Sequence, residues 1–184
     1  MHFIIGDIGN TSTRICILND RSKILKSVIF DTKNTFITKY KLITIFILAI
    51  LYINVGITHF TNPDFFLVIV PDYLPYHLFL VYVSGLFEII LGFMLLFKKT
   101  RKYAGIGLVF LLILVFPANI FLYQSAEAQS VYDISKNKAF VRLFFQAPLI
   151  LLAFWHSLSE EYKYFDIFCG VIFIPTIIYF ISLA

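Results

Sequence analysis

The chain has 184 residues, of which 60% are hydrophobic and 14% are charged. Soluble domains usually carry about 45–50% apolar and about 25% charged residues, so this composition excludes an ordinary soluble domain. The formal net charge is +4, but the basic residues cluster beside the apolar segments. That pattern is typical of membrane topology and argues against a nucleic-acid partner. We therefore expect an all-α integral membrane protein in the lipid bilayer.

The two cysteines, Cys16 and Cys169, lie far apart in the sequence, and no CxxC pair is present. We therefore expect neither a dithiol redox centre nor a cysteine-ligated metal site within this chain. The other polar residues show neither the spacing of a metal site nor that of a catalytic triad. The sequence thus predicts no metal and identifies no catalytic residue.

Residues 1–35 differ in character from the rest of the chain. An apolar run, a Gly/Asn/Thr turn, a second β-rich run and a polar turn at residues 19–23 follow one another. This order predicts two or three strands in hairpin order, forming a small β-hairpin-like appendage. So few strands cannot bury a core by themselves. We interpret residues 1–35 as a non-functional leader, a fused fragment of a truncated gene, or an artefact of sequence joining.

The motif DIGNT in this segment resembles the first phosphate loop of the sugar-kinase and actin-like ATPases, and most closely the N-terminus of type III pantothenate kinases. A strand there delivers a carboxylate near Mg²⁺, and a glycine lets the backbone approach a phosphate. The resemblance implies nucleotide binding by Asp7, Gly9, Asn10 and Thr11. Nothing later in the chain supplies a second phosphate loop or a catalytic carboxylate, so we expect only a kinase-like fragment.

From Lys39 onward the chain consists mainly of apolar segments, and roughly 20 such residues cross a hydrocarbon core of about 30 Å. We predict spans at residues 42–60, 77–97, 103–123 and 140–157, and a weaker fifth at 166–183. Pro117 should kink the third span. The expected fold is a four-helix transmembrane bundle over residues 36–160, followed by an additional apolar helix within 161–184.

The distribution of Lys and Arg predicts the orientation of these spans. With the N-terminus in the cytoplasm, twelve Lys and Arg residues lie on the inside and three on the outside. Omitting residues 1–35 leaves seven against three. Because cytoplasmic loops carry an excess of basic residues, we expect the loops at 61–76 and 124–139 to lie outside.

Residues 54–156 resemble the DoxX family, in the branch often called DoxX-like. The resemblance is carried in order by GITHFTNPDFFLVIVPDYLP, VYVSGLFEIILGFMLL, GLVFLLILVFPANIFLY and VRLFFQAPLILLAFW. It implies a four-helix bundle in the bacterial inner membrane and a link to quinone-related or oxidative-stress redox systems. A bound quinone, redox-complex subunits and a second copy of the chain are therefore expected partners, and the chain is more a subunit than an enzyme on its own.

A carboxylate in the middle of a span is costly unless it is paired, so Glu88 marks a functional interior. At 1.5 Å per residue, Glu88 lies about 16 Å below the predicted outer face. The other polar side chains of the spans lie in the same half of the bilayer, and the inner half has almost none apart from Trp155 and His156. We predict an outward-opening polar pocket, roofed by residues 61–76 and formed by Asn54, His59, Ser84, Glu88, Asn119, Arg142 and Gln146.

The partner of Glu88 stays open at this point. Gln146 is nearer than Arg142 in predicted depth, and a protonated Glu88 bonded to Gln146 or Asn119 is the alternative to an ion pair. We expect Asn119 to satisfy backbone groups that Pro117 frees. A buried interhelical hydrogen bond is the simpler role for Glu88, and ligand or proton binding is the functional one.

Three functions follow from these patterns. The first is a DoxX-like membrane protein that binds a small hydrophobic redox partner such as a quinone. The second is a non-enzymatic scaffold or assembly subunit held together by the polar cluster. The third is a truncated type III pantothenate kinase fused to a membrane protein.

Overall fold

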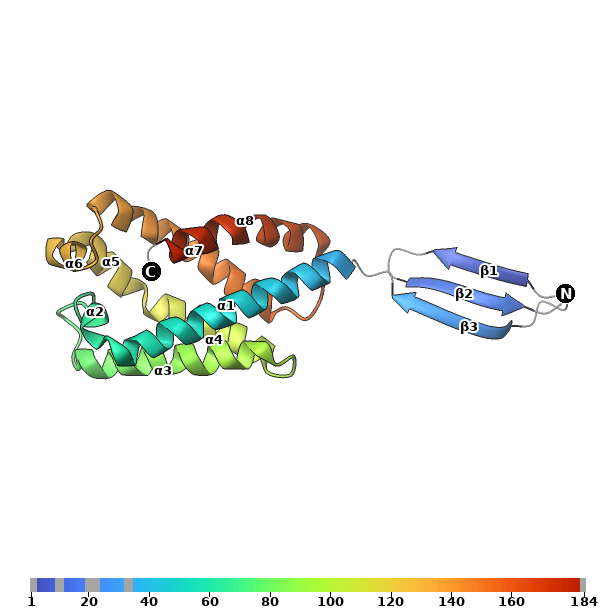
Figure 1. Cartoon of the computed structure of the whole chain (residues 1–184), viewed down its shortest axis with the longest axis horizontal. Helices are drawn as coiled ribbons and strands as arrows, with labels where there is room; N and C mark the ends of the chain where they lie inside the picture. The colour runs from blue at the N-terminus through green and yellow to red at the C-terminus, as the bar shows by residue number, and fades with distance from the viewer. Residues whose placement is uncertain (1–2, 9–11, 19–23, 32–34, 183–184) are drawn as a thin grey trace. The chain divides into compact units, whose positions relative to one another are not determined.

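The computed structural model describes residues 3–8, 12–18, 24–31 and 35–182. It divides the chain into two compact units, residues 1–40 and residues 41–184, which are described separately (Figure 1). The boundary lies five residues after the predicted end of the N-terminal segment at residue 35. The predicted C-terminal segment, residues 161–184, belongs to the same unit as the preceding helices.

The N-terminal unit contains a three-stranded antiparallel sheet in the order β1 (Phe3–Ile8), β2 (Ser12–Leu18) and β3 (Ile24–Asp31). The strands follow one another in hairpin order, as the sequence predicts. Ile4 is 75% exposed and Leu25 is 53% exposed. A single layer of strands has no second layer to cover its apolar side chains, so the described part of this unit buries little apolar surface.

The helical unit contains eight helices among the described residues. They are α1 (Thr35–Thr61), α2 (Pro63–Leu67), α3 (His77–Leu96), α4 (Arg101–Leu114), α5 (Phe116–Gln124), α6 (Ala126–Val131), α7 (Lys136–Ser157) and α8 (Lys163–Ile181). Five helical stretches are long and apolar enough to cross a membrane: Ile37–Thr61, His77–Leu96, Arg101–Gln124, Lys136–Ser157 and Lys163–Ile181. The chain is therefore an integral membrane protein. The segment predicted as a weaker fifth span is a continuous helix of 19 residues.

The third stretch is broken where the sequence predicts a kink. Helix α4 ends at Leu114 and α5 begins at Phe116, with Pro117 in the first turn of α5. Proline is tolerated in a first turn because the N–H that it lacks would have no partner within the helix. At this break the axis of α5 turns away from the axis of α4.

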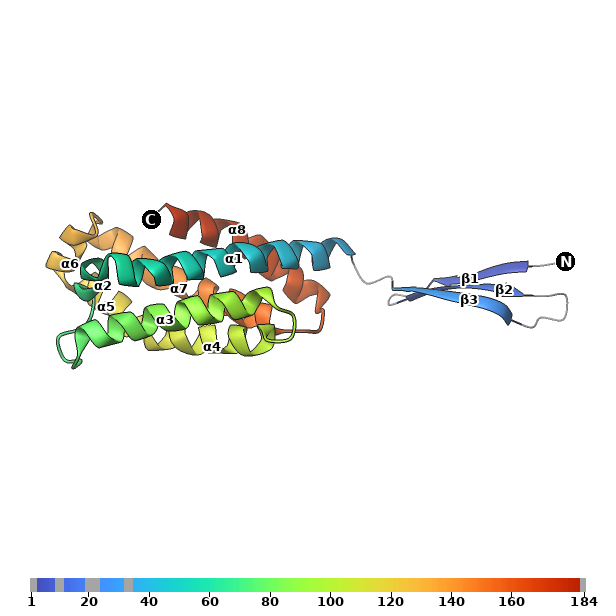
Figure 2. The same ribbon diagram turned by 60° about the horizontal axis from the view of Figure 1, so that its bottom comes forward.

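The long helices share one apolar core. Leu48 of α1, Leu95 of α3, Leu108 of α4 and Leu152 of α7 are fully or almost fully buried, and Phe173 of α8 is 4% exposed. Figures 1 and 2 show that α2 and α6 lie at one end of this unit, here called the cavity end. The turn between α3 and α4, Phe97–Thr100, lies at the other end, here called the turn end.

Helices α1 and α3 approach each other closely through glycine. A Cβ atom on Gly56 would lie 2.6 Å from the backbone oxygen of Gly85, and one on Gly85 would meet the side chain of His59. Small residues at such a crossing allow backbones to pack at short range. The crossing therefore fixes where His59 lies against α3.

Gly56→Ala should separate α1 from α3 and destabilise the protein by about 1–3 kcal/mol, because backbone atoms cannot move aside as a side chain can. Thermal unfolding of the purified protein in detergent, followed by fluorescence-detected gel filtration, measures the change in Tm. Gly107→Ala is the matched control, since its Cβ would meet only the flexible end of Leu91, at 2.7 Å from Cδ2. Equal Tm values for the two variants would contradict the role of the crossing.

Candidate functional site

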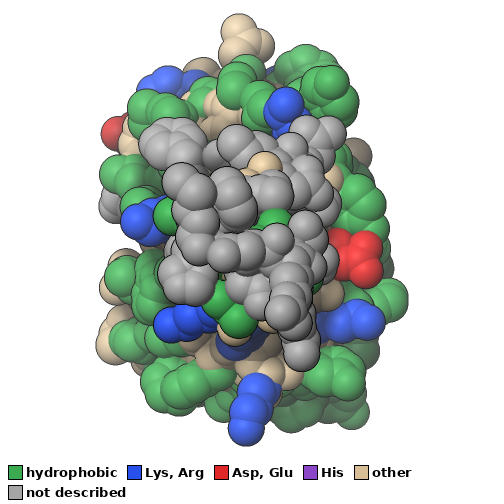
Figure 3. Space-filling model, turned by 90° about the vertical axis from the view of Figure 1, so that its right-hand side faces the viewer, with side chains coloured by type: hydrophobic (Ala, Val, Ile, Leu, Met, Phe, Trp, Pro, Cys, Tyr) green, Lys and Arg blue, Asp and Glu red, His purple; other side chains and the backbone are tan. Residues whose placement is uncertain are grey.

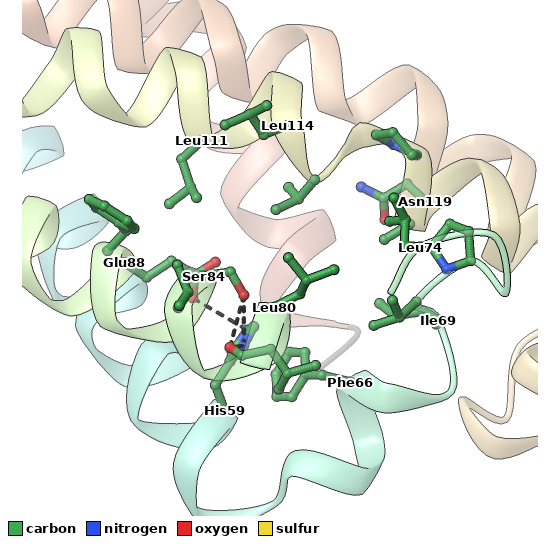
Figure 4. A pocket seen from close by; sticks show the side chains of 18 of the residues that line it. His59, Phe66, Ile69, Leu74, Leu80, Ser84, Glu88, Leu111, Leu114 and Asn119 are labelled. Carbon is green, nitrogen blue, oxygen red and sulfur yellow. Dashed lines mark hydrogen bonds and ion pairs between the residues drawn. The ribbon is translucent and has the colours of Figure 1, made fainter. Parts of the chain in front are cut away.

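A cavity of about 320 Å³ lies at the cavity end, between α1, α3, the α4–α5 break and residues 66–74. Its walls are mostly apolar, with a polar strip on the α1–α3 side (Figure 4). Five of the predicted pocket residues line it, namely His59, Ser84, Glu88, Asn119 and Arg142. The structure therefore places most of the predicted polar residues around one cavity.

The polar strip centres on His59 and Glu88. The Nδ1 atom of His59 lies 2.8 Å from the carbonyl oxygen of Val81 and 3.2 Å from Ser84 Oγ. Since a carbonyl only accepts, Nδ1 carries a hydrogen and donates it there. The Ser84 hydroxyl donates in turn to the same Val81 oxygen at 2.9 Å. These contacts fix the ring and direct His59 Nε2 toward Glu88.

His59 Nε2 and Glu88 Oε2 are 3.6 Å apart. With Nδ1 already protonated, the pair is attractive when one further proton lies on either Nε2 or the carboxylate. Glu88 Oε2 is buried and makes no hydrogen bond within the described residues. An unsatisfied buried polar atom costs about 1–3 kcal/mol, so Glu88 is the strongest candidate in this cavity to bind a ligand's polar group.

The residue paired with Glu88 in the structure is therefore His59, which is none of the three candidates left open by the sequence, Gln146, Asn119 and Arg142. Gln146 donates to the carbonyl oxygen of Leu112 at 2.9 Å and accepts a hydrogen bond from Asn119 Nδ2 at 3.0 Å. Gln146 thus satisfies a carbonyl in the last turn of α4, the task expected of Asn119. Gln146 is buried against the backbone of α4 and does not line the cavity, so it does not reach Glu88.

Arg142 extends this chain of hydrogen bonds to the cavity. Its Nε atom donates to Asn119 Oδ1 at 2.9 Å, and its guanidinium lies 5.5 Å from the centre of the Tyr132 ring. Burial raises the pKa of Tyr132, and the charge of Arg142 opposes that shift. The side-chain amides of Asn119 and Gln146 each have a donor and an acceptor partner, so these hydrogen bonds hold α5 and α7 in one register.

The remaining predicted site residues lie elsewhere. Asn54 is exposed on α1 and does not line the cavity. His59 does line the cavity; it is 7% exposed because α2 covers it and Phe66 stacks on its ring at 3.6 Å between centroids. In the N-terminal unit, Asp7 pairs with Arg14 in the β1–β2 register, and Gly9, Asn10 and Thr11 lie outside the described residues.

A second polar cluster lies at the turn end, where the sequence predicts almost no polar side chains. The Lys41 Nζ atom lies 3.7 Å from Asp166 Oδ1 and donates to the carbonyl oxygen of Leu158 at 3.1 Å. The other carboxylate oxygen of Asp166 accepts from the backbone N–H of Tyr162 at 2.7 Å, and Trp155 Nε1 donates to Oδ1. The cluster thus joins Trp155, one of the two polar residues that the sequence predicts at this end, to Lys41 and Asp166.

His156 is the third buried ionisable group of this cluster. Thr44 donates its hydroxyl hydrogen to the carbonyl oxygen of Lys41 at 2.8 Å, so His156 Nε2 donates to Thr44 Oγ1 at 3.0 Å. Its Nδ1 is buried and makes no hydrogen bond within the described residues. The cluster ties the start of α8 to α1 and to the end of α7. Because Lys41 and Asp166 are far apart in the sequence, only their approach in space reveals the cluster.

Asp166→Asn should lower the free energy of unfolding by about 3–5 kcal/mol, because it leaves Lys41 buried without its counter-charge and places an N–H₂ group against N–H donors. The measurement is the Tm in detergent. Asp72→Asn, at an exposed position between α2 and α3, is the control and should leave the Tm unchanged. A Tm for Asp166→Asn equal to that of the control would mean that the ion pair contributes nothing.

Comparison with known proteins gives one match. A family model described as a domain of unknown function, DUF8561, matches residues 48–157, which is more than half of the chain. All the residues that line the cavity lie inside this range, whereas Lys41 and Asp166 lie outside it. No curated protein and no solved structure matches the chain. The chain therefore belongs to the DUF8561 family.

Proposed function

We propose that the cavity binds a small membrane-soluble molecule with an apolar body and a hydrogen-bonding head. The observation that carries this proposal is the buried Glu88 Oε2, which has no hydrogen-bond partner among the described residues and lines a largely apolar cavity beside His59. Ligand sites typically combine apolar walls with a few converging polar groups. The His59–Glu88 pair supplies those groups here.

A quinone meets these requirements. A protonated Glu88 carboxyl group can donate a hydrogen bond to a quinone carbonyl, and an ionised Glu88 can accept one from a hydroquinone hydroxyl. The apolar walls, among them Val55, Leu80 and Leu111, suit a ring and the first part of a tail. The resemblance of residues 54–156 to DoxX proteins supports the same ligand class and a role as a subunit of a membrane redox system.

A scaffold role is the alternative, and the chain of hydrogen bonds through Arg142, Asn119 and Gln146 favours it. These hydrogen bonds join α5 to α7, and they leave neither the Asn119 nor the Gln146 side-chain amide unpaired. Satisfied polar networks hold helices in a unique register. Under this alternative the cluster would hold the fold together for assembly with other subunits or with a second copy.

Glu88→Leu should raise the Kd of a decyl-substituted benzoquinone about tenfold, which corresponds to about 1.4 kcal/mol, because the head group loses a buried hydrogen-bond partner. Calorimetric titration of the protein in lipid nanodiscs measures the Kd. Glu127→Gln, exposed in the first turn of α6, is the control and should bind as the wild type does.

Two outcomes separate the alternatives in this experiment. Absence of saturable binding by the wild type would overturn the ligand proposal. Loss of folded Glu88→Leu protein would support the scaffold role, because a residue needed only for the ligand should leave the yield and the Tm close to the wild type. Glu88→Gln, which keeps the size of the side chain, provides folded protein for the titration in that case.

We further propose that the N-terminus is cytoplasmic, in the inner membrane of a bacterium, and that the cavity end faces outward. The turn end carries Lys98, Lys99, Arg101 and Lys102, whereas residues 61–76 at the cavity end contain neither Lys nor Arg. The face drawn in Figure 3 shows Lys and Arg side chains spread among hydrophobic ones. Basic residues of this kind are retained on the cytoplasmic side.

The orientation is tested with a membrane-impermeant maleimide on intact cells, in a chain that carries Cys16→Ser. Tyr73→Cys, at a side chain 74% exposed at the cavity end, should be labelled directly. Lys99→Cys should be labelled only after the membrane is permeabilised. The reverse pattern would place the cavity end in the cytoplasm.

A further inference from the structure

The lining of the cavity is not uniformly buried, and its exposed members lie within spans. Among the lining residues, Val55 is 38% exposed, Phe87 is 50% exposed and Leu114 is 75% exposed. The two most exposed belong to neighbouring helices: Phe87 lies near the middle of α3, and Leu114 is the last residue of α4. Side chains that line a cavity and are also exposed mark its opening.

The opening lies where α3 and α4 separate. Nearer the turn end the two helices are in close contact, because a Cβ on Gly107 would lie 2.7 Å from Leu91 Cδ2. Toward the cavity end α4 stops at Leu114 and the chain changes direction at the Pro117 break. Figure 4 shows Ser84 and Glu88 on one wall and Leu111 and Leu114 on the wall that faces them. Phe87 and Leu114 therefore flank a gap between two spans.

The segment between α1 and α3 covers the cavity on the side away from the turn end. Ile69 is 8% exposed, Pro71 is fully buried, and Phe66 stacks on His59. These side chains come between Glu88 and the end of the helical unit where a water phase would lie. The expected outward opening is thus covered by apolar side chains, whereas Phe87 and Leu114 belong to stretches that are long and apolar enough to cross a membrane.

We propose that the ligand is a long-chain amphiphile that enters from the bilayer between Phe87 and Leu114 and leaves its tail in the lipid. This inference rests on the proposed function, since it takes Glu88 and His59 as the site of the head group. A volume of about 320 Å³ is at the lower end of the roughly 300–1,000 Å³ typical of ligand pockets, so it encloses a head and little more. The apolar sides of the gap match an acyl or isoprenoid chain.

This route predicts which side chains control entry. Phe87→Trp and Leu114→Trp each narrow the gap and should slow the association of decyl-benzoquinone with the protein in nanodiscs about tenfold, with the Tm unchanged. Phe93→Trp and Phe110→Trp are matched controls, because Phe93 and Phe110 are 56% and 63% exposed on the same helices and do not line the cavity. The controls should associate at the wild-type rate.

A second measurement needs no ligand and therefore separates this inference from the proposed function. A bimane label on Leu114→Cys, in a chain with Cys16→Ser and Cys169→Ser, should be quenched by lipids with a nitroxide on the acyl chain and not by iodide in water. Quenching by iodide alone would show that the gap faces water and would overturn the proposal, whether or not benzoquinone binds.

Other outcomes also decide against the route. Slow association for Val55→Trp together with wild-type rates for Phe87→Trp and Leu114→Trp would place the entrance beside α1. Disulfide-linked dimers of Leu114→Cys in membranes would show that a second copy covers the gap. If the wild type fails to bind benzoquinone while lipids quench the bimane label, the proposed ligand is wrong and the lipid-facing opening stands.

Discussion

The close crossing of α1 and α3 is the contact on which the site depends. Because Gly56 and Gly85 carry no side chains, the two backbones approach far enough for His59 to reach both the Val81 carbonyl and Glu88. A carboxylate in a span without such a partner would cost several kcal/mol. The two glycines thus bring His59 next to Glu88 and lower the cost of burying its carboxyl group. Glu88 in turn forms part of the polar wall of the cavity.

The two buried carboxylates, Asp166 and Glu88, differ in how completely they are paired. Around Asp166, both carboxylate oxygens have partners and Lys41 lies close by, as expected for a group that holds helices together. Around Glu88, one carboxylate oxygen has no hydrogen bond within the described chain. Complete pairing favours a structural role, and incomplete pairing beside a cavity favours binding.

The sequence predicts the parts of this structure that depend on neighbouring residues. The spans follow from apolar runs of sufficient length, the α4–α5 break follows from Pro117, and Glu88 is conspicuous because a carboxylate is costly in lipid. The pairing of these groups depends on how each helix is rotated and where helices cross. Depth along a span therefore suggested Gln146 for Glu88, whereas packing selects His59. The Lys41–Asp166 pair joins residues 125 positions apart in the sequence, so no local pattern predicts it.

A layer of buried leucines separates the two polar clusters and limits the passage of water and ions along the helical unit. Leu48, Leu108 and Leu152 are at most 1% exposed and belong to the shared core of the helical unit. Such close packing leaves no room for water or ions to pass along the helices. In the described structure, a molecule bound beside Glu88 therefore has a closed apolar layer between it and the turn end.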